Sequence, residues 1–249
     1  MGPIYEPKGK AKEYADFALN IYNGCPHKCP YCFSPLVLRK DRKEFHLNAE
    51  PRENIVEKTK NQLESWREQG IMGRTIELCF TCDPFPYGYD HTPTFEIIKA
   101  IKESGNNVKI LTKNFRIEGK KPGGFGRLLD LLDKNDWFGC SFDGTKEIYQ
   151  DVMNCRVELA STMHYMHQKT NTWISFEPVV DDKEVLDAMR LLSKDVDNYK
   201  IGKLNYQKSD IDWKEFGRKA EELCKEIGID YYIKESLRKE MGQEMLRRS

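Results

Sequence analysis

The chain has 249 residues, and its 40 basic and 40 acidic side chains give a formal net charge of zero. A balanced charge excludes a global electrostatic attraction to nucleic acid or to a membrane surface. No apolar run is long enough to span a membrane, and we find no internal repeat and no Pro/Gly/Ser linker. We therefore expect one domain over residues 1–249, with a core at about 17–205 and a C-terminal extension at 206–249.

Short apolar runs alternate with longer amphipathic runs along the chain. The apolar runs predict strands at 17–22, 75–81, 108–112, 137–142, 172–176 and 199–204. The amphipathic runs predict helices at 54–69, 92–104, 127–134, 156–168, 183–193 and 213–227. An edge strand at 229–233, a helix from Ser236 and a surface loop at 114–125 complete the set. This alternation predicts an α/β fold, in which right-handed crossovers wind six βα units into a partial (β/α)6 barrel of the TIM type.

A loop rich in cysteine follows the first predicted strand. Cys25, Cys29 and Cys32 have the spacing C-x3-C-x2-C. Thiolates are the usual ligands of iron–sulfur clusters, and three of them leave the fourth iron of a [4Fe–4S] cube open to a small molecule. In βα barrels the functional residues lie at the carboxyl ends of the strands, which is where this loop begins.

A zinc site is the alternative for the same loop. The three thiols, together with His27 or His46, match the Cys3His ligand set of structural zinc. In that case the protein is a zinc-binding module that recognises RNA or a protein partner. Zinc modules, however, usually place a second ligand pair well downstream of the first.

Further landmarks give the chain a resemblance to a known family. The loop GCPHKCPYC at 24–32, with an aromatic residue before its third cysteine, resembles the signature of the radical S-adenosylmethionine (SAM) enzymes. It is most similar to the loop of the spore photoproduct lyase-like group. TCDP at 81–84, LTK at 111–113 and CSF at 140–142 follow in the order of that group's motifs.

The resemblance implies an activity. In that superfamily the cluster reductively cleaves bound SAM and yields a 5′-deoxyadenosyl radical, which abstracts hydrogen from a substrate. We expect an enzyme of the lyase or oxidoreductase class, supplied with electrons by reduced flavodoxin or ferredoxin. A nucleic acid, a peptide and a small metabolite all remain open as substrates. Eight cysteines without a signal peptide indicate a cytoplasmic location, with no membrane partner.

Carried over residue by residue, the resemblance also implies roles in binding SAM. Tyr31 is expected near the adenine, and Cys82 and Asp83 near the methionyl amino group. Lys113 and Ser141 are expected at the SAM carboxylate or ribose. A lysine at the end of a strand suits a carboxylate, because its ammonium group is a compact point charge.

The candidate site also includes a carboxylate and two candidate catalytic residues. Glu177 is a candidate partner of the cofactor or the substrate, and Tyr31 and Cys82 are the candidate catalytic residues. The lyase returns hydrogen from a cysteine aided by a tyrosine, but here the matching positions hold Phe80 and Phe33. Cys82 is then the nearest thiol on the face of Phe80, and alternation along the strand places Cys79 on the opposite face.

Overall fold

The computed structural model describes residues 2–116, 124–146, 149–205 and 207–243. Seven strands follow one another in chain order, and every strand pairing within the two units described below is parallel. The strands are β1 (Phe17–Leu19), β2 (Thr75–Leu78), β3 (Asn107–Thr112), β4 (Trp137–Ser141), β5 (Asn171–Phe176), β6 (Asn198–Ile201) and β7 (Asp230–Ile233). The predicted α/β class is confirmed, and the predicted edge strand is the seventh strand.

Helices alternate with these strands. They are η1 (Gly9–Glu13), α1 (Ser34–Leu38), α2 (Arg42–Phe45), α3 (Ile55–Glu68), α4 (Thr92–Glu103), α5 (Gly124–Leu131), α6 (Val152–His167), α7 (Asp182–Leu192), α8 (Trp213–Ile227) and α9 (Glu235–Glu240). The sequence did not predict η1, α1 and α2, because elements of four or five residues are too short to show a helical period. Within the described part of the chain, no helix has the length and apolar character needed to cross a bilayer.

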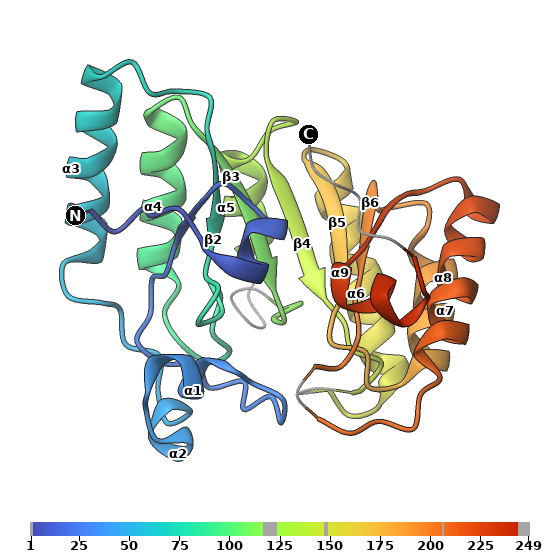
Figure 1. Ribbon diagram of the computed structural model, residues 1–249. Helices are drawn as coiled ribbons and strands as arrows, with labels where there is room; N and C mark the ends of the chain where they lie inside the picture. The colour runs from blue at the N-terminus through green and yellow to red at the C-terminus, as the bar shows by residue number, and fades with distance from the viewer. Residues whose placement is uncertain (1, 117–123, 147–148, 206, 244–249) are drawn as a thin grey trace. The chain divides into compact units, whose positions relative to one another are not determined.

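The chain packs as two compact units, the first formed by Met1–Phe138 and Gln168–Asn171 and the second by Gly139–His167 and Thr172–Ser249. The first unit contains the parallel strands β1, β2 and β3, with α3 packed against α4 (Figure 1). Along β3 the side chains alternate between half-buried and buried, as expected for a strand with one face turned to the core. Whether the chain forms one domain stays a prediction.

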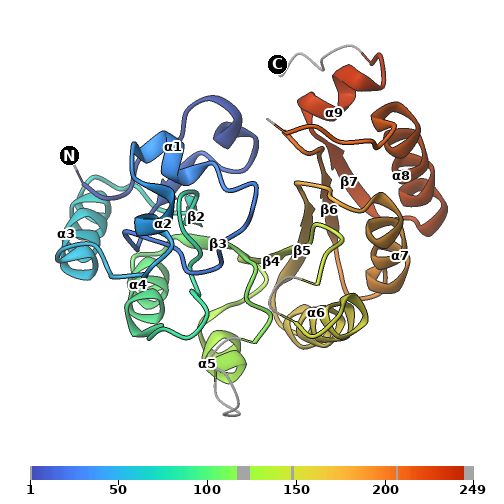
Figure 2. The ribbon, with the colours of Figure 1, turned by 90° about the horizontal axis from the view of Figure 1, so that it is seen from below.

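The second unit contains the parallel strands β5, β6 and β7. Figure 2 shows α6, α7 and α8 in sequence along one side of these strands. Five of the six residues of β5 are buried, which is typical of a parallel strand covered on both faces. Asp181 and Asp212 cap α7 and α8, since each side chain accepts hydrogen bonds from two backbone N–H groups of the first turn.

Four of the predicted strands end earlier than expected, and the ends of β1 and β2 shape the site. The second strand ends at Leu78 because Cys79 adopts a left-handed backbone with φ of 70°. The first strand ends at Leu19, and the side chain of Asn20 then bonds to the Tyr5 hydroxyl at 2.7 Å and to the Thr81 N–H at 2.9 Å. The predicted surface loop at 114–125 was wrong at both ends. Asn114 is buried at its start, and α5 begins at Gly124 before its end. Residues 117–123 lie outside the described residues.

Candidate functional site

The thiol loop begins with a glycine that leaves no space for a side chain. A Cβ atom at Gly24 would lie 2.3 Å from the carbonyl oxygen of Asn48 and 2.7 Å from that of Phe45. The next residue, Cys25, donates its N–H to the Phe45 carbonyl at 3.2 Å, and its own carbonyl lies 2.7 Å from Nδ1 of His46. The start of the loop is therefore packed against the end of α2 and the residues that follow it.

Arg42 braces the rest of the loop. Its guanidinium group donates to the carbonyls of Cys29 at 2.6 Å, Pro30 at 2.8 Å and Cys32 at 2.9 Å. One planar guanidinium group thus orients three carbonyl oxygens of the loop toward itself. Arg42 belongs to the basic run at 39–43.

The donor chemistry of this loop fits a metal cluster. Cys25, Cys29 and Cys32 are free thiols, and each is partly exposed. Burial raises the pKa of the Cys25 thiol, and the nearby Asp83 carboxylate raises it further. A bound metal ion would counteract this rise in pKa, because it deprotonates a coordinating thiol.

The same thiols do not form a mononuclear site. Among the described residues, no group of three or more His, Cys, Asp or Glu side chains is placed to hold a single ion. A [4Fe–4S] cube does not need such convergence, since each thiolate binds a different iron. Of the histidines of the zinc alternative, His27 accepts the Tyr87 N–H at Nε2 at 3.2 Å, whereas His46 contacts the Cys25 carbonyl through Nδ1 and its Nε2 is buried without a hydrogen-bond partner among the described residues.

The turn after β2 lies beside the thiol loop and is organised by Asp83. One carboxylate oxygen of Asp83 accepts from the Thr112 hydroxyl at 2.6 Å and from the Phe85 N–H at 2.8 Å. The other accepts from the backbone N–H of Lys113 at 2.7 Å. Asp83 is 8% exposed, so its carboxylate ties the end of β2 to the end of β3.

His27 connects this turn to the thiol loop. Its Nε2 atom lies 3.9 Å from an Asp83 oxygen, a separation short enough for an ion pair if the ring is charged. Burial, however, lowers the pKa of His27, and the Asp83 carboxylate opposes this effect only in part. Because Nε2 also accepts the Tyr87 N–H, we interpret His27 as neutral, with its proton on Nδ1.

Lys113 and Tyr31 come together, as their predicted roles at one cofactor require. The Lys113 ammonium lies 5.2 Å from the centroid of the Tyr31 ring, which is within the range of a cation–π contact. Tyr31 comes from the thiol loop and Lys113 from the end of β3. Two sequence motifs separated by 82 positions thus meet at the carboxyl edge of the first unit.

Cys82 contacts Cys79, and the prediction that strand alternation separates them was wrong. The two thiols are close enough to shift each other's pKa: burial and then Cys82 raise the pKa of Cys79, whereas Cys79 opposes the effect of burial on Cys82 and helps to lower its pKa. Strand alternation does not apply, because β2 has already ended and the left-handed backbone of Cys79 reverses its side chain. A left-handed conformation costs a residue with a Cβ atom about 1–2 kcal/mol, so the surrounding structure holds this turn in place.

In the second unit, Ser141 and Glu177 lie next to each other. The Ser141 hydroxyl is 3.4 Å from the Glu177 carbonyl oxygen, a long hydrogen bond at best. The Glu177 carboxylate is ion-paired with the Lys234 ammonium and accepts from the Asn205 side chain at 3.2 Å. Lys234 is 3% exposed, so this is a buried pair at the ends of β5 and β7.

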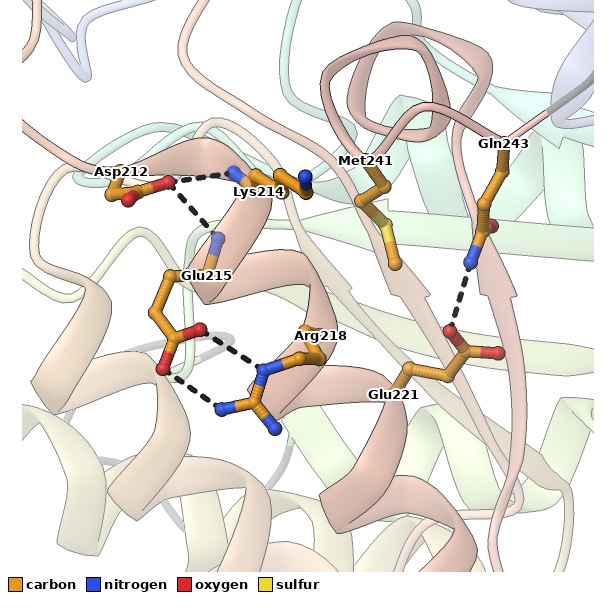
Figure 3. A pocket seen from close by; sticks show the side chains of 7 residues that line it. All are labelled: Asp212, Lys214, Glu215, Arg218, Glu221, Met241 and Gln243. Carbon is orange, nitrogen blue, oxygen red and sulfur yellow. Dashed lines mark hydrogen bonds and ion pairs between the residues drawn. The ribbon is translucent and has the colours of Figure 1, made fainter.

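A cavity of about 260 Å3 in the second unit lies along α8 (Figure 3). In its lining Glu215 is paired with Arg218, and Glu221 accepts a hydrogen bond from the Gln243 side chain. None of the predicted site residues lines it. The chemistry suggested by the sequence therefore lies elsewhere, at the carboxyl ends of the strands.

Sequence reasoning missed three of the residues that shape the site: Arg42, His46 as a carbonyl partner, and Lys234. Arg42 lies in a run of basic residues, a pattern that is typical of a solvated loop. His46 was considered only as a metal ligand. Lys234 followed the predicted edge strand, and a lysine directly after an apolar strand, like Lys113, was the available signal.

The family comparison gives one match over most of the chain. The family model described as the radical SAM superfamily matches residues 19–202. This range includes the thiol loop, Asp83, Lys113 and Glu177. No curated protein matches the sequence.

Solved structures resemble the fold. A spore photoproduct lyase variant with bound AdoMet and dinucleoside spore photoproduct matches with a TM-score of 0.62 and 11% identity, over 92% of this chain and 78% of that chain. SuiB from Streptococcus suis, bound to S-adenosylmethionine, matches with a TM-score of 0.59 and 15% identity, over 87% of this chain and 50% of that chain. A second SuiB structure, bound to precursor peptide SuiA, has a TM-score of 0.61 at 16% identity, over 90% of this chain and 50% of that chain. At such identities the likeness concerns the fold.

Proposed function

Because the chain belongs to the radical SAM superfamily, we propose that its thiol loop holds a [4Fe–4S] cluster at which SAM is reductively cleaved. The observation that carries this proposal is the loop itself. Its three free thiols lie on a backbone held by Arg42, and its first residues are clamped by Gly24 and His46. When bound, the cluster supplies the electron that splits SAM into methionine and a 5′-deoxyadenosyl radical.

The protein residues bind and orient SAM. Lys113, whose backbone N–H is fixed by Asp83, presents its ammonium beside the Tyr31 ring and is suited to the SAM carboxylate. Tyr31 offers its ring to the adenine. We assign Cys82 and Asp83 to the side of the methionyl amino group. The Asp83 carboxylate already accepts three hydrogen bonds from the protein, so the main effect of Asp83 is to position Lys113.

Ser141 and Glu177 belong to the second unit. The Glu177 carboxylate is oriented by Lys234 and Asn205, and Gly202 leaves space for it, since a Cβ atom there would lie 2.8 Å from the Glu177 side chain. Such fixed orientation suits a group that receives a hydrogen bond from a ribose or a substrate hydroxyl. We assign both residues to the cofactor or the substrate.

The substrate is open between a nucleic acid, a peptide and a small metabolite. Structural neighbours with a dinucleoside ligand and with a precursor peptide match the fold about equally well, with TM-scores of 0.62 and 0.61. Their substrates therefore do not decide the choice. We further propose that a reduced flavodoxin or ferredoxin delivers the electron, and that the protein acts in the reducing cytoplasm, where its eight free thiols are stable.

Anaerobic reconstitution with iron and sulfide tests the cluster. We expect about four irons per chain and a charge-transfer band that dithionite bleaches. Cys32→Ala should abolish the band, whereas Cys140→Ala, a buried thiol on β4 outside the loop, should retain it. Stoichiometric zinc without iron uptake would contradict the proposal and favour the zinc-binding alternative.

Binding of SAM to the reconstituted protein tests the assignment of Lys113. Lys113→Ala should weaken binding by about 1.5–3 kcal/mol, the contribution of one charge-assisted hydrogen bond. Lys99→Ala is the control, since Lys99 lies on α4 and pairs only with the exposed Glu103 in an i, i+4 contact. Equal dissociation constants for the two variants would show that Lys113 does not contact SAM.

A further inference from the structure

The short helix α1, next to the thiol loop, turns an apolar face to solvent. Phe33, Leu36 and Val37 have the spacing i, i+3 and i+4, so they share one face of this helical turn, and they are 49%, 82% and 62% exposed. The buried residues of the helix are Ser34 and Pro35. We call the three exposed side chains the α1 face. Apolar side chains gathered in solvent commonly mark a surface that another protein covers.

The α1 face adjoins the thiol loop and has further apolar neighbours. Phe33 directly follows Cys32, the third thiol of the loop. Figure 2 shows α1 and α2 side by side, and the exposed Leu47 follows α2. The exposed Tyr89 donates its hydroxyl to the Leu47 carbonyl at 3.1 Å. With Tyr87, these side chains make up six of the twelve large exposed apolar residues in the described ranges, so apolar exposure is concentrated near the thiol loop.

Cations lie around the α1 face. The segment 33–47 contains four basic and two acidic side chains, a net charge of +2 in a chain whose net charge is zero. Arg39, Lys40 and Lys43 are exposed, and none of them is ion-paired with another described residue. One of the two carboxylates, that of Asp41, is already engaged, since it accepts the Glu44 N–H. The surface thus has an apolar centre and a charged rim, as protein–protein interfaces do.

Three kinds of partner are candidates for this surface, and its charges distinguish them. A second copy of the chain would place the same face against itself across a two-fold axis, so the cations would face one another. Nucleic acid favours polar and strongly positive surfaces, whereas the centre here is apolar. A protein with an acidic surface complements both the centre and the rim.

The position of the face indicates which acidic protein binds there. The face begins one residue after Cys32, and Arg42 of the basic run donates to the carbonyls of Cys29, Pro30 and Cys32. Electron transfer between proteins slows steeply with distance, so an electron donor has to dock close to the cluster. Electron-transfer complexes also use small interfaces, typically below about 1,200 Å2, which suits a short helix and its neighbours.

We propose that the α1 face and the basic run at 39–43 form the docking surface for the electron donor, a small redox protein with acidic side chains around its cofactor. This inference rests on the proposed function and names the partner surface of the same site. In the transfer the reduced cofactor of the donor loses one electron and the oxidised cluster gains it, and no covalent bond forms or breaks. The cations steer the donor to the surface, and the apolar centre holds it there.

Carbodiimide cross-linking of the full chain with an oxidised flavodoxin, and in parallel with an oxidised ferredoxin, tests docking without any activity. The reagent joins lysines to carboxylates that touch them. We expect cross-links at Lys40 and Lys43 with at least one carrier, and their loss at about 0.5 M salt, which screens exposed charges. Leu36→Glu should abolish the cross-links. Leu191→Glu, at an exposed position of α7 in the second unit, should retain them.

Reduction of the reconstituted cluster, followed as bleaching of its band, separates docking from the cluster itself. With reduced flavodoxin or ferredoxin, Leu36→Glu and the double variant Arg39→Glu/Lys43→Glu should react at least about tenfold more slowly than the wild type. Dithionite is small and needs no docking surface, so its rate should be equal in all variants. Lys183→Glu is the charge control, because Lys183 is exposed on α7 and has no ion pair among the described residues. Val37→Glu replaces Leu36→Glu if that variant fails to retain iron.

Different results would overturn the docking surface and the proposed function. Equal rates for the wild type and Leu36→Glu with both carriers, or cross-links that avoid residues 39–43, would overturn the docking surface. Self-association of the wild type that Leu36→Glu abolishes would assign the face to a second copy, and release of both carriers by RNA would assign it to nucleic acid. A wild-type protein that takes up no iron, or whose cluster dithionite does not reduce, would refute the proposed function, and this proposal with it, before a carrier is added.

Discussion

Arg42 shapes the thiol loop through the backbone rather than through sulfur. Its guanidinium group is the donor to three loop carbonyls, of Cys29, Pro30 and Cys32. Without it these oxygens turn to water, and the loop gains conformations in which the thiols diverge. Since the loop is partly exposed, solvent replaces part of what is lost.

We therefore predict that Arg42→Ala lowers cluster retention more than it lowers stability. The protein should lose most of its iron on desalting after reconstitution, while the midpoint of thermal unfolding moves by only a few degrees, as for a loss of about 1 kcal/mol. Lys43→Ala is the matched control, because it removes the same charge from the adjacent exposed residue. If both variants retain iron equally, the carbonyl bonds of Arg42 are not what holds the loop.

At the level of single residues, the sequence predicted chemistry better than contacts. It named Lys113 and Tyr31 separately, and the structure brings them together at 5.2 Å. It named Asp83 as a ligand, but three donors from β3 and the turn occupy that carboxylate. Two of these donors, at Thr112 and Lys113, come from a segment distant in sequence, so no local pattern indicates them. The separation of Cys79 from Cys82 failed for a local reason: a left-handed residue without glycine leaves no sequence signal.

At the level of elements, the thiol loop depends on one position without a side chain. Gly24 lies against the carbonyls of Phe45, the last residue of α2, and of Asn48, which follows this helix. These backbone atoms cannot move aside as a flexible side chain does. The segment itself is fixed by Asp41, whose side chain caps α2 through the Glu44 N–H at 2.9 Å.

We predict that Gly24→Ala expels the loop from this segment and abolishes cluster assembly. The added methyl group would overlap the Asn48 oxygen at 2.3 Å, and overpacking of this kind typically costs about 1–3 kcal/mol or more. Gly126→Ala is the control: it lies in α5 with no atom within 4 Å of the new Cβ, and it should stabilise the helix by about 0.5–1 kcal/mol. Iron content and urea unfolding of both variants measure the outcome, and a Gly24→Ala protein with full iron content would refute the prediction.

Long elements were predictable and short ones were not. The six core strands and the long helices follow from hydrophobic period, and their observed ends differ from the predicted ones by a few residues. Strand ends depended on single residues, such as Cys79, that break the ladder by tertiary contacts. The helix α1 precedes the basic run and α2 includes its last two residues; both are too short to have a period, so the scaffold of the thiol loop was not foreseen.

At the level of the whole chain, the match to the family ends before the last strand. The family model covers residues 19–202, and β7 and α9 lie beyond it. The predicted C-terminal extension is nevertheless part of the second unit, since β7 pairs with β6 and its following residue, Lys234, pairs with Glu177. The extension thus provides the cation that neutralises a buried carboxylate of the family core.

We predict that Lys234→Met destabilises the second unit strongly, because it leaves the Glu177 carboxylate buried without its cation. Loss of one partner of a buried ion pair costs about 3–5 kcal/mol, whereas replacement of both partners is often close to neutral. Urea unfolding should therefore show a large fall in midpoint for Lys234→Met and recovery of most of it when Glu177→Gln is added.

A surface pair in the same unit is the matched control for this experiment. Lys203 pairs with Glu240, and the two side chains are 20% and 42% exposed, compared with 4% and 14% for Lys234 and Glu177. Lys203→Met should cost no more than about 1 kcal/mol, because solvent screens an exposed pair. Equal midpoints for Lys203→Met and Lys234→Met would mean that Glu177 is neutral or hydrated in the folded protein. In that case a carboxylate fixed by Lys234 would no longer be available to orient a cofactor or a substrate, and the role proposed for Glu177 would fail with it.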